Sequence, residues 1–237
     1  MPNAAQNCLT CPVRGPHCFC SLTTETLLEL QAIGTHIHFG AGETVLHEDS
    51  RVDRVFVLCR GRIKLTASSS NGKLLIVRIA GPGDVLGLAS LLNEVRHKVT
   101  AQTLESCELK SISRAGFLAF METFREVGRN AAVSVAWEYE GMLLTARRLA
   151  TSSSAAGKLA SALLDWARLG LPPSSTHPAP AIEFHMPLTH EELGSMTGLS
   201  RETVTRLLGK FRREGLLELE GERMILRAPA KLEALYS

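Results

Sequence analysis

Six cysteines are the residues of this sequence best suited to chemistry, and four of them lie within its first twenty positions. Two of those four form a C-x-x-C pair, a spacing that places thiolates at adjacent corners of a metal or cluster site. The crowded four are Cys8, Cys11, Cys18 and Cys20. A cubane iron-sulfur cluster takes four thiolates. Three can come from this segment, so the fourth must come from Cys59 or Cys107.

The cysteines are not expected to form disulfides. The N-terminal residues lack the pattern of a secretion signal, and no apolar run approaches the roughly 18 residues needed to span a bilayer. We therefore expect a cytoplasmic protein with no membrane partner. In a reducing compartment, metal ligation, redox sensing or burial must account for the thiols. Three interpretations stay open: an iron-sulfur cluster, a structural zinc site on Cys8, Cys11 and Cys20, or a sensor for a nucleotide or haem with incidental cysteines.

A second constellation lies near the C-terminus. The net charge of +2 is too small to indicate nucleic-acid binding, but basic residues concentrate in Arg201–Arg213. Thr189 and Ser200 are placed to cap two helices, and Gly198 suits the left-handed turn between them, which predicts a helix-turn-helix. The second helix of this motif enters the major groove of double-stranded DNA, where its first polar residues meet base edges and phosphates. These candidates are Arg201, Glu202, Thr205 and Arg206.

The elements that must position these residues follow from periodicity and turns. An apolar share of 45% with 21% charged residues is that of a folded chain rather than a disordered one. Residues 36–113 alternate in short segments divided by turns such as Asn71-Gly72, which predicts an antiparallel β-roll or barrel. Beyond Ile182, a strand, two helices and a hairpin turning at Glu220-Gly221 are typical of a winged helix-turn-helix. We predict an α+β chain made of a cysteine-rich lead (1–22), a β-roll sensor domain (23–114), a dimerisation helix (115–150) and a DNA-binding domain (151–237).

The long helix predicted over residues 115–150 carries a recurring apolar pattern. Its spacing is close to seven residues, which favours a seam with the same helix of a second copy over packing on its own β-roll. The seam residues are Met121, Phe124, Gly128, Ala131, Val135, Met142 and Leu149. Glu138 interrupts them. We expect it either within the seam, where two facing carboxylates would weaken the dimer, or at its solvated edge.

This order of elements resembles the CRP/FNR family of bacterial transcription regulators over essentially the whole chain. The turn Gly81-Pro82-Gly83-Asp84-Val85-Leu86-Gly87 resembles the family's β-roll signature, and Leu199-Ser200-Arg201-Glu202-Thr203-Val204 followed by Arg206 resembles its recognition helix. The resemblance implies a cyclic-nucleotide-binding-like β-roll and a homodimer that binds a palindromic operator and contacts RNA polymerase. Both TGTGA-like and TTGA-like half-sites remain open. No catalytic constellation accompanies these motifs, so we do not expect an enzyme.

The same resemblance bears on the sensor. Members that bind cyclic nucleotides carry an acid and an Arg-Ser pair, where this chain has Leu86-Gly87-Leu88-Ala89-Ser90 and Arg96-His97-Lys98. Cys107 resembles the barrel cysteine that completes the cluster in oxygen-sensing members, and Phe19-Cys20-Ser21-Leu22 resembles a ligand segment of other branches. The resemblance therefore implies a 4Fe-4S cluster whose state reports on oxygen or redox conditions and controls dimerisation and DNA affinity. The expected ligands are Cys8, Cys11, Cys20 and Cys107, with Cys18 and Cys59 as alternates.

Overall fold

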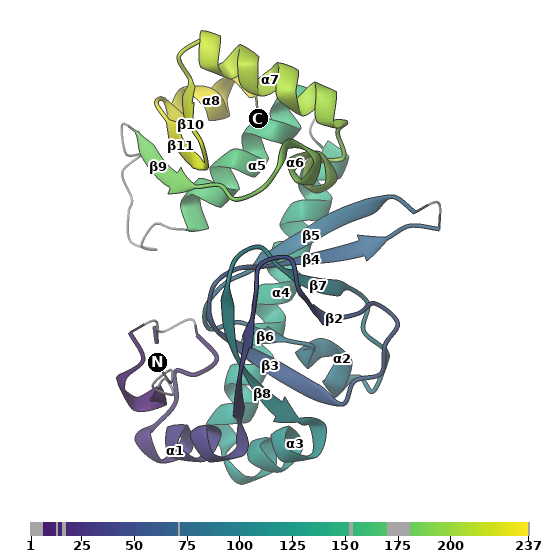
Figure 1. Ribbon diagram of the computed structural model, residues 1–237, viewed down its shortest axis with the longest axis vertical. Helices are drawn as coiled ribbons and strands as arrows, with labels where there is room; N and C mark the ends of the chain where they lie inside the picture. The colour runs from purple at the N-terminus through teal and green to yellow at the C-terminus, as the bar shows by residue number, and fades with distance from the viewer. Residues whose placement is uncertain are drawn as a thin grey trace. The chain divides into compact units, whose positions relative to one another are not determined.

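The structure, a computed structural model, describes residues 7–12, 14–15, 18–70, 72–151, 154–169 and 181–236. The chain divides into two compact units, which are treated separately below. The N-terminal unit holds residues 1–73 and 77–142, and the C-terminal unit holds residues 74–76 and 143–237. Figure 1 labels the elements along the chain. No helix in the described ranges combines the length and the hydropathy needed to cross a membrane.

Two antiparallel sheets make the β-roll, which confirms the predicted fold of this part of the chain (Figure 1). Their strand orders are β1-β8-β3-β6 and β2-β7-β4-β5. The strands are β1 (Thr35–Phe39), β2 (Thr44–Leu46), β3 (Arg54–Arg60), β4 (Ile63–Ser68), β5 (Leu74–Ala80), β6 (Val85–Leu86), β7 (Thr100–Thr103) and β8 (Cys107–Ser113). Leu58, Ile63 and Leu109 are buried together between the sheets. Gly72, in the left-handed region at φ 78°, belongs to the turn predicted between β4 and β5.

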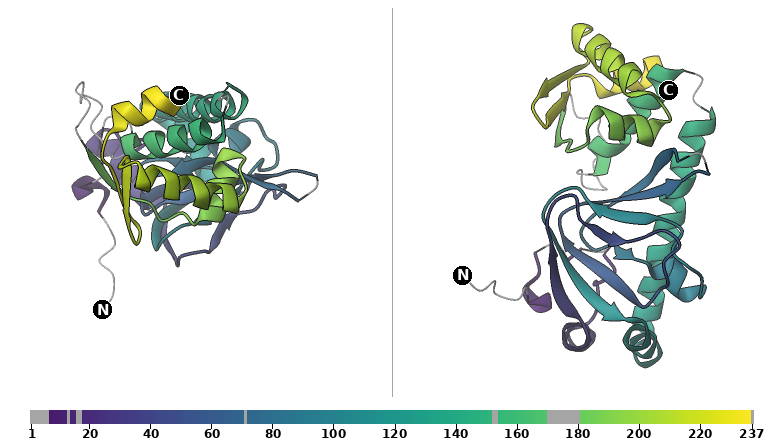
Figure 2. Two further views of the ribbon diagram at one scale, coloured as in Figure 1. Left: turned by 90° about the horizontal axis from the view of Figure 1, so that it is seen from above. Right: turned by 45° about the vertical axis from the view of Figure 1, so that its right-hand side comes forward.

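Short helices and one long helix cover the outside of the roll, as the right-hand view of Figure 2 shows. They are η1 (Cys8–Thr10), α1 (Thr24–Ile33), α2 (Leu88–Leu92), α3 (Arg114–Thr123) and α4 (Arg125–Thr151). A second core joins this layer to the sheet, with Phe19, Phe117 and Phe120 buried in it. Phe19 comes from the cysteine-rich lead and stacks on Phe117 at 5.7 Å between ring centroids. The lead is therefore part of the packed unit.

The prediction of one unbroken helix over residues 115–150 is wrong. The helix stops at Thr123 and restarts at Arg125, because Phe124 adopts an extended conformation at φ −118° and ψ 105°. That conformation lets the Phe124 ring pack against the core and meet Phe120 edge to face at 5.5 Å. A helix can break in this way without proline, because burial of an aromatic ring stabilises the fold by more free energy than one helical hydrogen bond does.

The predicted dimer seam is also wrong, because most of its residues lie on the side of the helix that packs against the chain's own N-terminal unit. Ala131 is buried in the core of the N-terminal unit, and Met121, Phe124 and Val135 pack against that same core. Met142 lines a pocket of the β-roll. These residues cover the chain's own roll, the alternative that the spacing disfavoured. The opposite side of α4 exposes a different apolar set, which includes Val133 at 44% and Trp137 at 47%.

Among the described residues, a three-stranded sheet with the helices α5 to α8 confirms the predicted winged helix-turn-helix in the C-terminal unit. Its elements are α5 (Ala155–Leu169), β9 (Ile182–His185), α6 (His190–Thr197), α7 (Arg201–Arg213), β10 (Leu217–Glu220), β11 (Arg223–Leu226) and α8 (Pro229–Tyr236). The strand order is β10-β11-β9. Thr189 forms a capping box with Glu192, and Gly198 adopts φ 70° after α6. Each local signal thus acts where the sequence predicted it.

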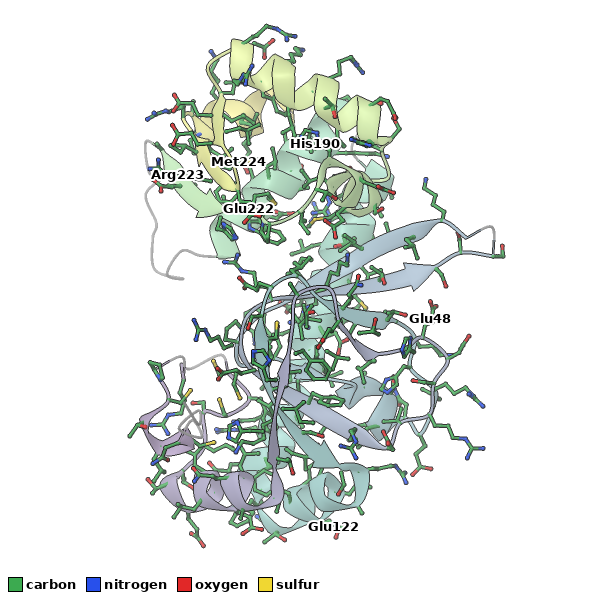
Figure 3. All side chains as sticks on the ribbon, in the orientation of Figure 1. Glu48, Glu122, His190, Glu222, Arg223 and Met224 are labelled. Carbon is green, nitrogen blue, oxygen red and sulfur yellow. The ribbon has the colours of Figure 1, made fainter. Side chains whose placement is uncertain are left out.

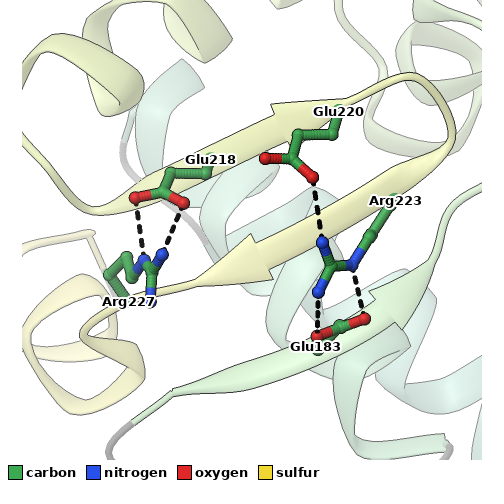
Figure 4. Close-up of polar contacts among 5 residues, drawn as sticks. All are labelled: Glu183, Glu218, Glu220, Arg223 and Arg227. Atoms are coloured by element: carbon green, nitrogen blue, oxygen red, sulfur yellow. Dashed lines mark hydrogen bonds and ion pairs between the residues drawn. The ribbon is translucent and has the colours of Figure 1, made fainter.

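Acidic side chains of the wing hairpin are held by arginines within the sheet (Figure 4). Arg223 binds both carboxylate oxygens of Glu183 and also contacts Glu220 at 2.9 Å. Arg227 binds the Glu218 carboxylate in the same two-pronged way. These bonds lower the pKa of Glu183 and of Glu218. The wing therefore presents paired charges rather than a basic surface.

This pairing predicts how the stability of the C-terminal unit depends on pH. Because the folded-state pKa of Glu183 is depressed, its contribution is complete above the unfolded value of about 4.3 and is lost as pH falls through the lower folded value. The Glu183→Gln variant should melt at a lower temperature than the parent chain at pH 7, and this difference should be smaller at pH 3. Circular dichroism melts at the two pH values check this. A difference of the same size at both pH values would show that the ionised carboxylate is not its source.

Candidate functional site

Four cysteines of the lead and the roll surround one pocket of the N-terminal unit. They are Cys8, Cys11, Cys20 and Cys59. Figure 3 shows several sulfur atoms, drawn in yellow, gathered between the lead and the strands. The described part of the chain contains no three His, Cys, Asp or Glu side chains at mutual ligating distance. The thiols thus surround the pocket without closing on its centre.

The lead is fixed at this pocket by backbone hydrogen bonds. Cys8 N donates to Gln31 Oε1 on α1 at 3.1 Å, and Phe19 N donates to Gly83 O at 3.0 Å. Gly83 has φ 95°, and a Cβ there would lie 2.4 Å from Cys18 Sγ. Only glycine lets the lead approach the turn so closely. Gly83 was noted in the sequence as part of a turn, but this second role depends on a tertiary contact.

The lead is also hydrogen-bonded to the long helix α4. Asn130 Nδ2 donates to Phe19 O at 2.9 Å and to Ser21 O at 3.0 Å, so it holds the carbonyls on both sides of Cys20. Glu126 accepts from Thr23 Oγ1 at 2.7 Å and from Thr23 N at 3.1 Å. Sequence reasoning missed Asn130, because nothing local in a polar helical residue indicates a partner more than a hundred positions away.

Cys107 does not reach this pocket. It is fully buried at the start of β8, in the core that contains Leu58 and Leu109 between the two sheets. Its thiol donates to Arg62 O at 3.4 Å and to Glu105 O at 3.2 Å. Successive side chains of a strand point to opposite faces, so Cys107 shares the inner face with Leu109. The structure therefore groups Cys59, the alternate, with the lead, and separates the expected fourth ligand from it.

Two basic side chains line the cysteine pocket with buried nitrogens that lack partners. Lys110 of β8 is 1% exposed, and its Nζ has no hydrogen-bond partner among the described residues. His36 of β1 pairs with Lys110 across the sheet, and its Nε2 is likewise buried without one. Burial lowers the pKa of His36, and the neighbouring Lys110 charge adds to this effect. An unpaired buried ammonium is costly and calls for a compensating anion.

Two thiols of the pocket, those of Cys20 and Cys59, have raised pKa values. Burial raises the pKa of the Cys59 thiol to about 11, with Cys8 adding to the shift and Lys110 opposing it. The pKa of the Cys20 thiol is raised by its hydrogen bond with Cys18 and then by burial. Metal ligation requires thiolates, so a metal entering here has to displace these protons.

A second pocket, of about 280 Å³, lies in the β-roll beside α4. Glu138 lines it, so the two positions expected for this residue, a dimer seam or its solvated edge, are both wrong. Burial raises the pKa of the Glu138 carboxyl, while Arg78 opposes that shift. Arg78 itself pairs with Asp84 at 2.6 Å. Arg78 of this pocket therefore already has two carboxyl groups near it, those of Glu138 and Asp84.

The predicted DNA-reading residues lie together on the exposed side of α7. They are Arg201, Glu202, Thr205 and Arg206. Thr205 Oγ1 donates to Arg201 O at 2.9 Å and lies 2.8 Å from Nδ1 of His190, labelled in Figure 3. A bond from its own backbone N–H, followed by one from Ser200, lowers the pKa of Glu202 and keeps its carboxylate ionised. Val204, Leu207 and Phe211 bury the other side of the helix.

Comparison with known families places these geometries in context. The model of the Crp-like helix-turn-helix domain matches residues 157–235, and that of the cyclic nucleotide-binding domain matches residues 36–124. The chain belongs to the CRP/FNR family of transcription regulators. Membership of the CRP/FNR family makes it a DNA-binding regulator, with the helix-turn-helix as its DNA-binding element.

Relatives within the CRP/FNR family match along nearly the whole chain. The nitrogen fixation regulation protein FixK of Bradyrhizobium diazoefficiens is 28% identical over 233 residues, which cover 96% of this chain and 93% of the relative. The transcriptional activator protein FnrL of Cereibacter sphaeroides is 29% identical over 231 residues, with 95% and 90% covered. The solved structure of FixK2 from Bradyrhizobium japonicum has a TM-score of 0.73 at 22% identity, covers 86% of this chain and 98% of its own, and supports the fold. These relatives are transcription regulators and not enzymes, which confirms the expectation from the sequence.

Proposed function

We propose that this CRP/FNR regulator binds a palindromic operator as a homodimer, and that an iron-sulfur cluster held by the cysteine-rich lead controls its DNA affinity. The observation that carries the proposal is the pocket in which thiols of the lead meet a thiol of the roll beside the buried ammonium of Lys110. Contact with RNA polymerase is part of the same proposal.

DNA recognition is assigned to the exposed side of α7. Arg201 and Arg206 can each bind a guanine edge or a phosphate, and the ionised Glu202 can accept from a cytosine amine. The apolar stripe of α4 supports the homodimer, since Val133, Trp137 and Leu144 recur at helical spacing and are each more than 40% exposed. Two such chains would present two recognition helices to successive major grooves.

The donor set of the pocket fits a thiolate-bound cluster. Cluster irons take cysteine thiolates, and the whole assembly is anionic, so a buried lysine ammonium is a suitable neighbour. A structural zinc site also takes four thiolates, but zinc would make the site redox-inert. When bound, an iron-sulfur cluster supplies thiolate–iron bonds between the lead and the roll, which oxidants such as dioxygen disrupt.

The chain's own residues connect this site to the proposed dimer helix. Cys20 lies between the two carbonyls that Asn130 holds, and Thr23 is bound to Glu126. These contacts from α4 fall within one turn and a half of that helix, on the side that faces the lead. A change in the position of Cys20 would therefore move the backbone groups that Asn130 and Glu126 of α4 bind.

A nucleotide-responsive regulator is the second candidate, because residues 36–124 match the cyclic nucleotide-binding domain and the β-roll pocket is large enough for a small ligand. The charges oppose it. A cyclic phosphate entering this pocket would meet the Glu138 carboxyl and would have to compete with Asp84 for Arg78. Addition of cyclic AMP or cyclic GMP to metal-free protein should therefore leave DNA binding unchanged.

The proposal is tested by purification without oxygen. The full chain should be brown, should contain iron and acid-labile sulfide in equal amounts, and should bind a palindromic duplex more tightly before exposure to air than after it. Zinc content and colourless protein would indicate the structural metal site instead. Equal DNA affinity before and after air, with iron and sulfide lost, would separate the cluster from DNA binding.

A further inference from the structure

We infer that Cys59, and not Cys107, supplies the fourth thiolate of the metal site, so that Cys8, Cys11, Cys20 and Cys59 form one ligand set at the outer face of the β-roll. The inference rests on the proposed function, since it names the residues that hold the proposed cluster. Its basis is the arrangement of β3 and β8, the neighbouring central strands of one sheet.

The alternation of strand side chains separates the two barrel cysteines. Val57 belongs to the core between the sheet and its outer helices, whereas Leu58 belongs to the core inside the roll. Cys59 therefore returns to the outer face with Val57. The pairing of β3 with β8 shifts in register between Leu58 and Arg60, which places Cys59 at an irregularity of the ladder. Such irregularities re-aim a side chain.

On β8 the same alternation places Cys107 with Leu109 on the inner face, and Lys110 on the outer one. A metal ligated by Cys107 together with the lead would have to pass through the sheet between these faces. The Cys107 thiol is already engaged with two carbonyl oxygens, those of Arg62 and Glu105. Its position is that of a packed core residue.

Lys110 gives a second, independent indication that an anion belongs at the outer face. Its stem passes over Gly34, where a Cβ would lie 2.4 Å from Lys110 Cγ, and this glycine leaves room for the buried chain. The Nζ group ends in the pocket with no hydrogen-bond partner among the described residues. Lys110 and Cys59 line the same pocket, so the two groups lie within electrostatic reach. Four thiolates around a metal centre provide the missing anion.

The test compares Cys59→Ala with Cys107→Ala, both as full chains purified without oxygen and supplied with iron and sulfide. Cys59→Ala should lose most of its iron and sulfide together with the visible absorption of the parent. Cys107→Ala should keep the parent's iron, sulfide and spectrum, with only a lower melting temperature from the cavity left in the roll. The reverse pattern, a loaded Cys59→Ala and an empty Cys107→Ala, would overturn the inference.

Timed maleimide labelling of the unsubstituted chain avoids the question of whether a variant folds. Peptide mass spectrometry should find Cys59 protected while metal is bound and labelled after chelation, whereas Cys107 should resist labelling in both states. Labelling of Cys59 at the same rate in the two states would overturn the ligand assignment. Absence of iron and sulfide from the unsubstituted chain would instead refute the proposed function, so the two failures are distinguishable.

Discussion

Replacement of Arg206 by alanine is expected to weaken specific DNA binding by about 1 to 3 kcal/mol, a roughly 5- to 150-fold rise in Kd. Arg206 is exposed on α7, one turn after Glu202, while the buried side of that helix is formed by apolar residues. The substitution therefore removes a reading or clamping group and leaves the packing intact.

Fluorescence anisotropy under anaerobic conditions checks this with three labelled duplexes: one carrying palindromic TTGA half-sites, one carrying TGTGA half-sites and one with a scrambled sequence. Lys231→Ala is the matched control, because it removes an exposed positive charge from α8 rather than from α7. A base-reading role predicts a larger loss on the preferred duplex than on a scrambled one. A loss that is equal on all three duplexes would assign Arg206 to phosphate, and unchanged binding would remove α7 from the groove.

Replacement of Trp137 by aspartate should raise the Kd of the homodimer by roughly 30-fold or more, since a buried interface tryptophan typically contributes about 2 kcal/mol or more. Trp137 is 47% exposed on the side of α4 that turns away from the roll. Burial against a second copy would desolvate the aspartate carboxylate, and two such groups would repel across a two-fold axis.

Sedimentation velocity over a range of protein concentrations measures this effect. Leu28→Asp is the control, because Leu28 is 51% exposed on α1, outside the α4 stripe. The control should dimerise like the parent chain. If Trp137→Asp and the parent had the same dimer Kd, the α4 stripe would not be the interface.

The helix-turn-helix was fully predictable from sequence because its determinants are local. The hydroxyls of Thr189 and Ser200 cap the helices that directly follow them, and Gly198 makes the turn between. Such signals act over a few residues, so no knowledge of distant contacts is needed.

The long helix shows where this reasoning fails. Two apolar stripes run along α4, one represented by Val135 and the other by Trp137, and a spacing near seven residues fits either. Only the position of the β-roll decides which stripe is covered within the chain. Glu138 was misplaced for the same reason, since it faces the roll's pocket together with the first stripe.

The choice between the two barrel cysteines also depended on tertiary structure. Strand periodicity assigns Cys59 and Cys107 to opposite faces of the sheet, but the sequence does not say which face the lead covers. The packing of Phe19 beside Phe117 places the lead on the outer face. Lys110, the single cation of β8, was the signal in the sequence that a polar site lay on that side.

The hydrogen bonds from Asn130 have a consequence for repair of the proposed site. They hold the backbone around Cys20 without using any thiol, so Cys20 stays at the pocket when the metal is gone. Cys8 is then connected to this anchor by only twelve residues of chain, which can extend no further than about 40 Å. A short tether of this kind keeps a group at an effective concentration near the millimolar range. Once iron has bound again at Cys20, closure of the site by Cys8 would therefore be an intramolecular step that does not depend on how many copies of the regulator a cell holds, and the same molecule could be reloaded for successive exposures without being synthesised again.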